Sequence, residues 1–143
     1  MKTFFKTLLG VAVSLVVVFA LLLAVEQFSQ SVYPMPHAAK ENFEVMCAHV
    51  AEYPHWVLAA VVPMWSGIAF LGTWIARRLG NSVSGWIVGL LLLAGLGGNV
   101  AMLPYRIWFR IVMLIAIPAA IVVGYRLAKP KALLDSKTAD ANH

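Results

Sequence analysis

The sequence predicts an all-α membrane protein: a four-transmembrane-helix bundle with a short amphipathic outer helix. Four long stretches are apolar and almost free of charge, at residues 8–25, 56–76, 83–102 and 107–125. Mean hydropathy is +0.83. Only 12% of the residues are charged, against about 25% in a soluble domain. A chain of 143 residues is too short to bury this much apolar surface in a soluble core.

Each apolar stretch is long enough to cross a bilayer. The stretches hold about 18–21 residues, the helix length that spans a hydrocarbon core about 30 Å thick. No water is available there to pair with backbone groups, so each stretch has to be helical. The predicted helices span residues 4–27, 55–77, 83–103 and 107–127. They form one domain, residues 1–128, and the short connections make the last three helices antiparallel neighbours.

The first stretch also has features of a signal peptide. Lys2 and Lys6 precede its apolar run, as basic residues do in a secretory signal. The run is longer than the usual core of about 7–15 residues, and no Ala-x-Ala cleavage site follows at a suitable distance. We therefore expect an uncleaved first helix.

Residues 28–54 form the predicted outer segment. Its Tyr-Pro-Met-Pro sequence, residues 33–36, cannot be helical, because proline fixes its own φ and restricts the residue before it. Four apolar residues then recur at i, i+3, i+4 and i+7: Phe43, Met46, Cys47 and Val50. This spacing predicts a short amphipathic helix at about 38–52, lying on the outer surface.

The third helix is marked by a start signal and by small residues. Residues 80–82, Gly-Asn-Ser, contain a helix breaker followed by a cap, and we expect Ser82 to accept from the first free amides. Small residues form stripes on the third and fourth helices: Gly85 and Gly89, then Ala116, Ala120 and Gly124. Such stripes let helices approach closely in lipid. We interpret them as packing within the bundle, with a homodimer seam as the alternative.

The basic residues give the predicted orientation. With a cytoplasmic N-terminus, eight of the 11 Lys and Arg residues lie inside, and Lys40, Arg106 and Arg110 lie outside. This bias follows the positive-inside rule. We expect a multi-pass protein of the bacterial inner (plasma) membrane with both termini cytoplasmic. Residues 129–143, which lack an apolar period, are predicted to be a disordered tail. The net charge of +5 is an orientation signal, so no nucleic-acid partner is expected.

Polar residues near the outer ends of the helices form the candidate site. A carboxylate near hydrocarbon is costly unless it is paired or hydrated. Glu26 is therefore expected either to form an ion pair with Arg106 or Arg110 or to be a solvated carboxylate at the membrane surface. Asn99, an amide deep in the third helix, is expected to hydrogen-bond across helices. Its alternative role is to line a small polar cavity with Glu26.

No motif for catalysis or metal binding stands out. The chain has no H-E-x-x-H, no P-loop and no Gly-rich dinucleotide motif after a strand. In the outer segment, His49 and Glu52 are the only fair pair of possible metal ligands, and their spacing is a weak signal. We expect no catalytic residue, metal or cofactor. The helices carry no ionisable group at the membrane midplane, which argues against proton-coupled transport by a monomer.

Two motifs together resemble a known pattern. Glu26 is followed by the Tyr-Pro-x-Pro of residues 33–36, and Asn99 is followed by Pro104 and then by Trp108-Phe109. Their order and spacing resemble a family of small four-helix bacterial inner-membrane proteins with no assigned function. The resemblance extends over nearly the whole chain.

The resemblance implies the same topology and a gathering of residues at the outer end of the bundle. These residues are Glu26, Tyr33, Pro34, Asn99, Pro104 and Trp108. Tyr33 thereby joins the candidate polar cluster of Glu26, Asn99, Arg106 and Arg110. The family pattern often has a second proline before the fourth helix, where this chain has Arg106. The resemblance supplies no activity.

The sequence supports two functions of different classes. The first is a non-enzymatic subunit or accessory protein, which the packing motifs and the lack of a catalytic set favour. The second is a small-molecule or lipid binding or transport site between the helices, around Glu26, Asn99 and Arg110. A metal-binding outer loop is a third, weaker hypothesis. The expected partners are the lipid bilayer and either a membrane protein or a second copy of this chain.

Overall fold

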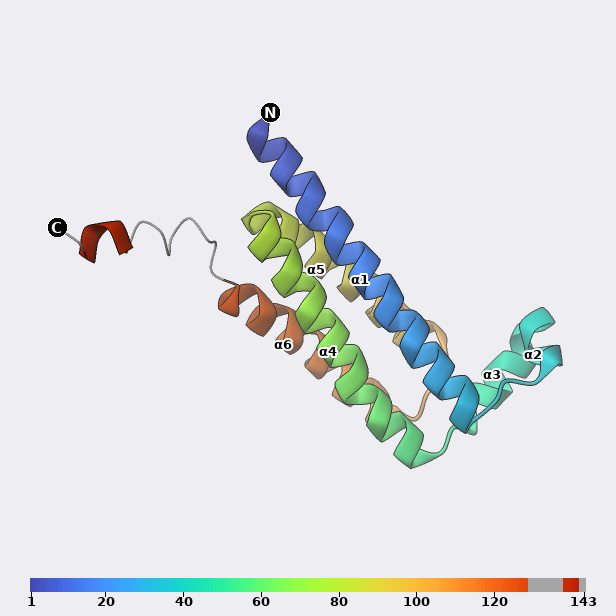
Figure 1. Cartoon of the computed structure of the whole chain (residues 1–143). Helices are drawn as coiled ribbons and strands as arrows, with labels where there is room; N and C mark the ends of the chain where they lie inside the picture. The colour runs from blue at the N-terminus through green and yellow to red at the C-terminus, as the bar shows by residue number, and fades with distance from the viewer. Residues whose placement is uncertain (129–137, 142–143) are drawn as a thin grey trace.

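The computed structural model describes residues 1–128 and 138–141. Its helices are α1 (Lys2–Val32), α2 (His37–Glu41), α3 (Phe43–Ala51), α4 (His55–Leu79), α5 (Ser82–Met102) and α6 (Ile107–Leu127). Four of them, α1, α4, α5 and α6, are long and apolar enough to cross a membrane (Figure 1). The predicted all-α bundle is confirmed. Residues 129–137 and 142–143 of the predicted disordered tail lie outside the described residues. The tail residues that are described, 138–141, are helical.

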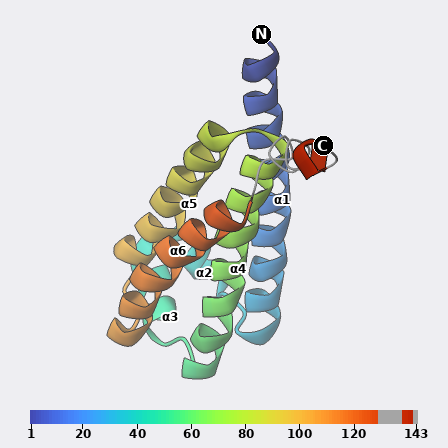
Figure 2. The same ribbon diagram turned by 90° about the vertical axis from the view of Figure 1, so that its left-hand side faces the viewer.

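The long helix α4 lies at the centre of the bundle. It packs against α1, α5 and α6, and Figure 2 shows it between α1 and α6. Because the four long helices run in alternating directions, the start of α1 and the end of α6 lie at the same end, together with the α4–α5 turn (Figure 1). We call this the proximal end. The opposite end, which carries residues 33–54 and 103–106, is the distal end.

The first helix runs past its predicted end at residue 27. Polar side chains continue it, since the Gln30 amide donates to Glu26 Oε1 one turn earlier at 2.8 Å. The helix ends at Tyr33, whose φ of −142° and ψ of 79° are not helical. Pro34 restricts the conformation of that residue. The prediction followed the loss of hydrophobicity, whereas the helix ends where the backbone is blocked.

The outer segment contains two short helices where the sequence predicted one. The break is at Asn42, which is extended and ends α2. Its side-chain oxygen accepts from the Glu44 amide at 2.9 Å and so caps α3. Asparagine favours such caps over helix interiors because its side chain competes for backbone groups. Both helices lie beside the distal end of the bundle (Figure 1).

Asn81, and not Ser82 as predicted, caps α5. Its side-chain oxygen accepts from the Ser84 amide at 3.0 Å, and the Ser84 hydroxyl accepts from the Asn81 amide at 2.9 Å. This reciprocal capping box needs a polar partner three residues after the cap, and Asn81 has one in Ser84. The Asn81 side chain also donates to Thr7 Oγ1 at 2.7 Å, which fastens the α4–α5 turn to α1.

Small residues bring the helix backbones close together in the proximal half. A Cβ added at Gly10 would meet the carbonyl oxygen of Ala76 at 2.7 Å. One added at Gly124 would meet the carbonyl oxygen of Phe70 at 2.5 Å, and one added at Gly89 would meet the side-chain Cγ2 of Ile121 on α6 at 2.9 Å. These glycines are therefore used for packing between helices of one bundle, where van der Waals contact replaces the hydrophobic effect.

Candidate functional site

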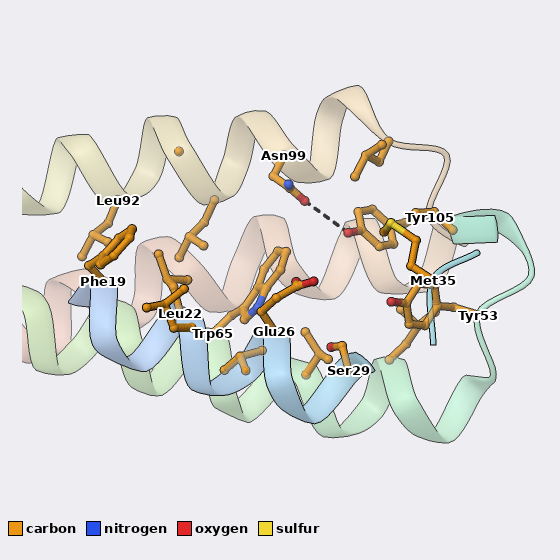
Figure 3. A pocket seen from close by; sticks show the side chains of 18 of the residues that line it. Phe19, Leu22, Glu26, Ser29, Met35, Tyr53, Trp65, Leu92, Asn99 and Tyr105 are labelled. Carbon is orange, nitrogen blue, oxygen red and sulfur yellow. Dashed lines mark hydrogen bonds between the residues drawn. The ribbon is translucent and has the colours of Figure 1, made fainter. Parts of the chain in front are cut away.

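A groove runs along the distal half of the bundle between α1 and α5 (Figure 3). Residues 15–29 of α1 and residues 91–99 of α5 form its walls, and α4 contributes its floor. The groove encloses about 620 Å³. Its distal end is closed by Met35, Tyr53 and Tyr105 from the connecting segments, and by α3.

Most of the groove lies along the part of α1 that has no fully buried residue. The buried residues of α1 are Gly10, Ser14 and Val18, one at each turn, and no residue of α1 beyond Val18 is buried. The Ser14 hydroxyl donates to the carbonyl oxygen of Gly72 at 2.6 Å, which fixes α1 on α4. On the α5 wall, Gly95 leaves room, because a Cβ there would meet nothing within 4 Å.

The walls of the groove are apolar and its long side is open. Leu58 and Leu92 lie deep in it and are 2% and 5% exposed. Phe19 and Leu91 lie on its two rims and are 63% and 51% exposed. Both rims belong to membrane-spanning helices. The opening therefore faces the region that acyl chains occupy in a bilayer.

Trp65 of α4 lies on the floor of the groove (Figure 3). Its ring packs edge-on against Phe109, with the ring centroids 6.4 Å apart. Among the described residues its indole N–H has no hydrogen-bond partner. A buried indole N–H usually finds one. Trp65 thus offers both an aromatic surface and a free donor to a molecule in the groove.

Polar groups gather at the distal end of the groove. Glu26 and Ser29 project from α1, Asn99 from α5, and Tyr53 and Tyr105 from the connections (Figure 3). The Tyr105 hydroxyl donates to Asn99 Oδ1 at 3.2 Å. The groove therefore has an apolar length and one polar end, which is the arrangement that suits an amphiphile.

The carboxylate of Glu26 is held in place by its neighbours on α1. The Gln30 side chain donates to Glu26 Oε1 at 2.8 Å, and its own carbonyl accepts from the Met35 backbone amide at 3.1 Å. Gln30 thus links the carboxylate to the loop that leaves α1. The other carboxylate oxygen of Glu26 has no hydrogen bond within residues 1–128 and 138–141.

Both tyrosines of the polar end are held in their neutral form. Burial raises the pKa of Tyr53 above its usual value, and the nearness of Glu26 and Tyr33 raises it further, while Ser29 acts in the opposite direction. Burial also raises the pKa of Tyr105, strongly, and Tyr53 and Glu26 add to that increase. The cause is the cost of placing a phenolate away from water beside a carboxylate.

A stack of rings covers the distal end beyond the groove. His49 of α3 is 8% exposed and lies against Tyr33, with the ring centroids 4.4 Å apart. Tyr53 meets both rings, at 5.0 Å from Tyr33 and 5.5 Å from His49. His49 Nε2 is buried without a hydrogen-bond partner among the described residues. This stack holds α3 over the groove, where Met46 and Val50 add to the lining.

The predicted polar cluster is only partly brought together. Glu26 and Asn99 both line the groove, as the cavity alternative required, whereas Arg106 and Arg110 do not. The contacts of the described residues include no ion pair between Glu26 and either arginine. Arg106 is exposed and Arg110 half-buried on α6, which packs on the far side of α4 from α1 (Figure 2). Tyr33 lies in the ring stack, outside the groove lining.

Sequence reasoning missed several residues of the site. Tyr53, Tyr105 and Ser29 lie in connections or at a helix end, where polar residues are ordinary. Gly95 stands among other glycines of α5 and carries no signal of its own. A tyrosine beside the proline at each connection, Tyr53-Pro54 and Pro104-Tyr105, is a signal that could have pointed to the distal end.

Neither a metal-binding group among the described residues nor a known relative indicates what the groove binds. Within the part of the chain that the structure describes, no three His, Cys, Asp or Glu side chains gather in a group that could hold a metal ion. In comparisons with known proteins, no family model, no curated protein and no solved structure matches this chain. The fold and the groove define the class: an all-α, four-helix membrane protein with an apolar groove open at its side.

Proposed function

We propose that this protein binds an amphiphilic small molecule or lipid in the α1–α5 groove and does not change it chemically. The observation that carries the proposal is the groove itself, which has an apolar length with an open side and a polar end at Glu26 and Asn99. The leucines and Phe19 would contact an acyl chain. The Glu26 carboxylate, the Asn99 amide and the two tyrosine hydroxyls would contact a polar head. Pockets of about 300–1,000 Å³ are typical of small-molecule sites.

We further propose that the distal end faces the outside of a bacterial inner membrane. The proximal end of the described chain carries five basic residues: Lys2, Lys6, Arg77, Arg78 and Arg126. The distal end carries three: Lys40, Arg106 and Arg110. The positive-inside rule favours a cytoplasmic proximal end. An amphiphile would then enter the groove sideways from the outer half of the bilayer.

A role as an accessory subunit or homo-oligomer has weaker support. The small residues that suggested a seam between chains are used inside the bundle, as Gly89 and Gly124 show by their contacts with α6 and α4. The lipid-facing sides of the long helices are apolar, which any membrane protein requires. A bound amphiphile remains compatible with such a role.

The groove can be tested through Trp65. A variant that keeps only this tryptophan, with Phe at the other four positions, is placed in nanodiscs of a saturated phosphatidylcholine. A monoacylglycerol with a dibrominated acyl chain is then titrated as a neutral quencher. Occupation of the groove predicts quenching that saturates at a low mole fraction. Random collision from the bilayer predicts quenching that stays proportional to the quencher.

Two matched substitutions on α5 make this test specific. Gly95 and Gly97 both leave open space around an added Cβ, but only Gly95 lines the groove. We expect Gly95→Leu to fill the groove and abolish the saturable quenching, and Gly97→Leu to leave it intact. Equal behaviour of the two variants, or the absence of a saturable phase in the parent protein, would refute the proposal.

A further inference from the structure

We propose that the polar end of the groove selects a head group with a cationic nitrogen, so that the ligand is an ammonium-bearing amphiphile. This inference rests on the proposed function and specifies its ligand class. Glu26 is the one charged side chain among the described residues that line the groove. No Lys, Arg or His of the described part of the chain contributes to that lining.

The charge of the groove disfavours a head group with a net negative charge. A phosphate or carboxylate without a cationic nitrogen of its own would face Glu26 at this end with no cation among the described lining residues to compensate. The distal arginines do not supply that cation, because Arg106 and Arg110 both lie outside the groove. A cationic nitrogen instead supplies the counter-charge that the exposed Glu26 carboxylate lacks among the described lining residues.

The geometry of Glu26 supports this role. One carboxylate oxygen accepts from Gln30, which orients the group, and the other has no hydrogen bond within the described chain. An ammonium has up to three donors and no acceptor, so it needs several oxygens around it. The Ser29 and Tyr53 hydroxyls line the same end of the groove and provide them (Figure 3).

Aromatic rings add a second attraction for a cation. Tyr53 and Tyr105 line the polar end beside Glu26 (Figure 3). The face of an aromatic ring attracts ammonium and quaternary ammonium groups, and this attraction strengthens when water is excluded. Because burial raises the pKa of both phenols, the rings stay neutral and retain their hydroxyl protons.

A cationic nitrogen reaches a membrane groove from two sources. One is a phospholipid with an amino head group, and the other is a free hydrophobic amine or quaternary ammonium compound. The chemistry that Glu26 recognises is the same in both. A titration therefore has two arms, each with the dibrominated acyl chain as quencher of Trp65.

The first arm compares free single-chain amphiphiles that share one chain: an alkylamine, an alkyl trimethylammonium, the neutral monoacylglycerol and an alkyl sulfate. The second arm compares phosphatidylethanolamine with phosphatidylglycerol. We expect the cationic heads to bind about tenfold more tightly than the neutral one. The alkylamine gains a charged hydrogen bond to Glu26, whereas the trimethylammonium, which has no N–H, gains only the attraction of its charge to the carboxylate and the aromatic rings. The sulfate and phosphatidylglycerol are expected to bind least. A preference for cationic heads in the first arm alone identifies a free amine or ammonium compound as the ligand. A preference in the second arm alone identifies an amino phospholipid.

Substitutions of Glu26 test its role directly. Glu26→Gln keeps a side-chain oxygen for Gln30 but removes the charge, so we expect the preference for cationic heads to disappear while the monoacylglycerol binds as before. Glu26→Asp keeps the charge and should restore much of the preference. Thermal unfolding of both variants confirms that the fold is retained.

The outcomes separate the two proposals. If all head groups bind equally and Glu26→Gln changes nothing, yet Gly95→Leu abolishes binding, the groove is a site and the cationic preference is wrong. If the anionic heads bind best, the inference is likewise overturned. If no amphiphile gives saturable quenching, both the proposed function and this inference fall.

Discussion

The hydroxyl of Ser14 donates a hydrogen bond to the carbonyl oxygen of Gly72, 2.6 Å away, and so joins α1 to α4. Ser14 is completely buried. The two helices are close here, because a Cβ on Gly72 would come within 2.7 Å of Val18 Cγ2. Leu15, the next residue of α1, already lines the groove. This contact therefore sets the proximal limit of the groove.

Removal of the Ser14 hydroxyl should weaken the bundle. We expect Ser14→Ala to lower the free energy of unfolding by about 0.6 kcal/mol, the average for a hydrogen bond between membrane helices. The measurement is unfolding in mixed micelles titrated with dodecyl sulfate. Ser66→Ala is the matched control, since the buried Ser66 hydroxyl has no hydrogen-bond partner within residues 1–128 and 138–141. Equal losses in the two variants would mean that the Ser14 bond contributes nothing.

The backbones of α1 and α4 approach so closely at Gly10 that no side chain should fit there. An added Cβ would meet Ala76 and Gly80 backbone atoms at 2.7 Å, so α1 has to move away from α4. We predict that Gly10→Ala costs about 1–3 kcal/mol, the usual range for overpacking. Gly97→Ala, where a Cβ meets nothing within 4 Å, should be neutral or stabilising in the same unfolding assay. A neutral Gly10→Ala would contradict the packing described for the proximal half.

The number and order of the spanning helices could be predicted from the sequence, because a bilayer dictates both the length and the apolarity of a spanning helix. The ends of the helices could not. Apolarity ends near residue 27, yet α1 continues to Val32 until Pro34 stops it. Asn42 and Asn81 became caps because their side chains bond to nearby amides, a local geometry that hydropathy does not report.

The sequence indicated the candidate site only through polar residues that stand in otherwise apolar stretches. Glu26 and Asn99 stand out as polar residues in apolar stretches, and both line the groove. The arginines fail as partners of Glu26 because the packing order places α6 across α4 from α1. Tyr53 and Tyr105 enter the site through the fold of the connections, which a linear pattern does not specify.

The ionisation of the tyrosines at alkaline pH should report the environment at the polar end of the groove. The pKa values of Tyr53 and Tyr105 are raised in the fold, so the folded state favours their neutral forms. That stabilisation is present below the usual tyrosine pKa of about 10 and is lost as pH rises through the raised values. In a spectrophotometric titration, two of the four tyrosines should ionise late.

The same titration tests the contribution of Glu26. Because its charge is among the causes of both raised pKa values, Glu26→Gln should lower them towards the usual range. Tyr53→Phe and Tyr105→Phe assign the two late transitions. Four tyrosines that titrate together near the usual pKa would contradict the buried polar end.

A hydrogen bond between aromatic side chains should stabilise the distal contact of α4 with α6. The Trp108 indole donates to His55 Nδ1 at 3.1 Å, and the two rings stack with centroids 5.9 Å apart. Trp108→Phe removes the donor and should lower unfolding stability by about 0.5–1.5 kcal/mol. Trp56→Phe, at a position that is 61% exposed, serves as the control in thermal unfolding. A larger loss for Trp56→Phe would contradict this role of Trp108.

Photocrosslinking in native membranes can show whether an amphiphile occupies the groove between α1 and α5. Cells are fed a fatty acid with a diazirine on its chain, which becomes part of their own lipids. After irradiation, mass spectrometry maps the adducts on the purified protein. The exposed α6 residues Leu114 and Ile115, 61% and 67% exposed, report random contact with the bilayer.

We predict that adducts concentrate on the groove walls, at residues 19–26 of α1 and 91–99 of α5, well above the level at Leu114 and Ile115. Gly95→Leu should reduce this enrichment and Gly97→Leu should not. Adducts spread evenly over all exposed apolar positions, with no effect of Gly95→Leu, would contradict the account.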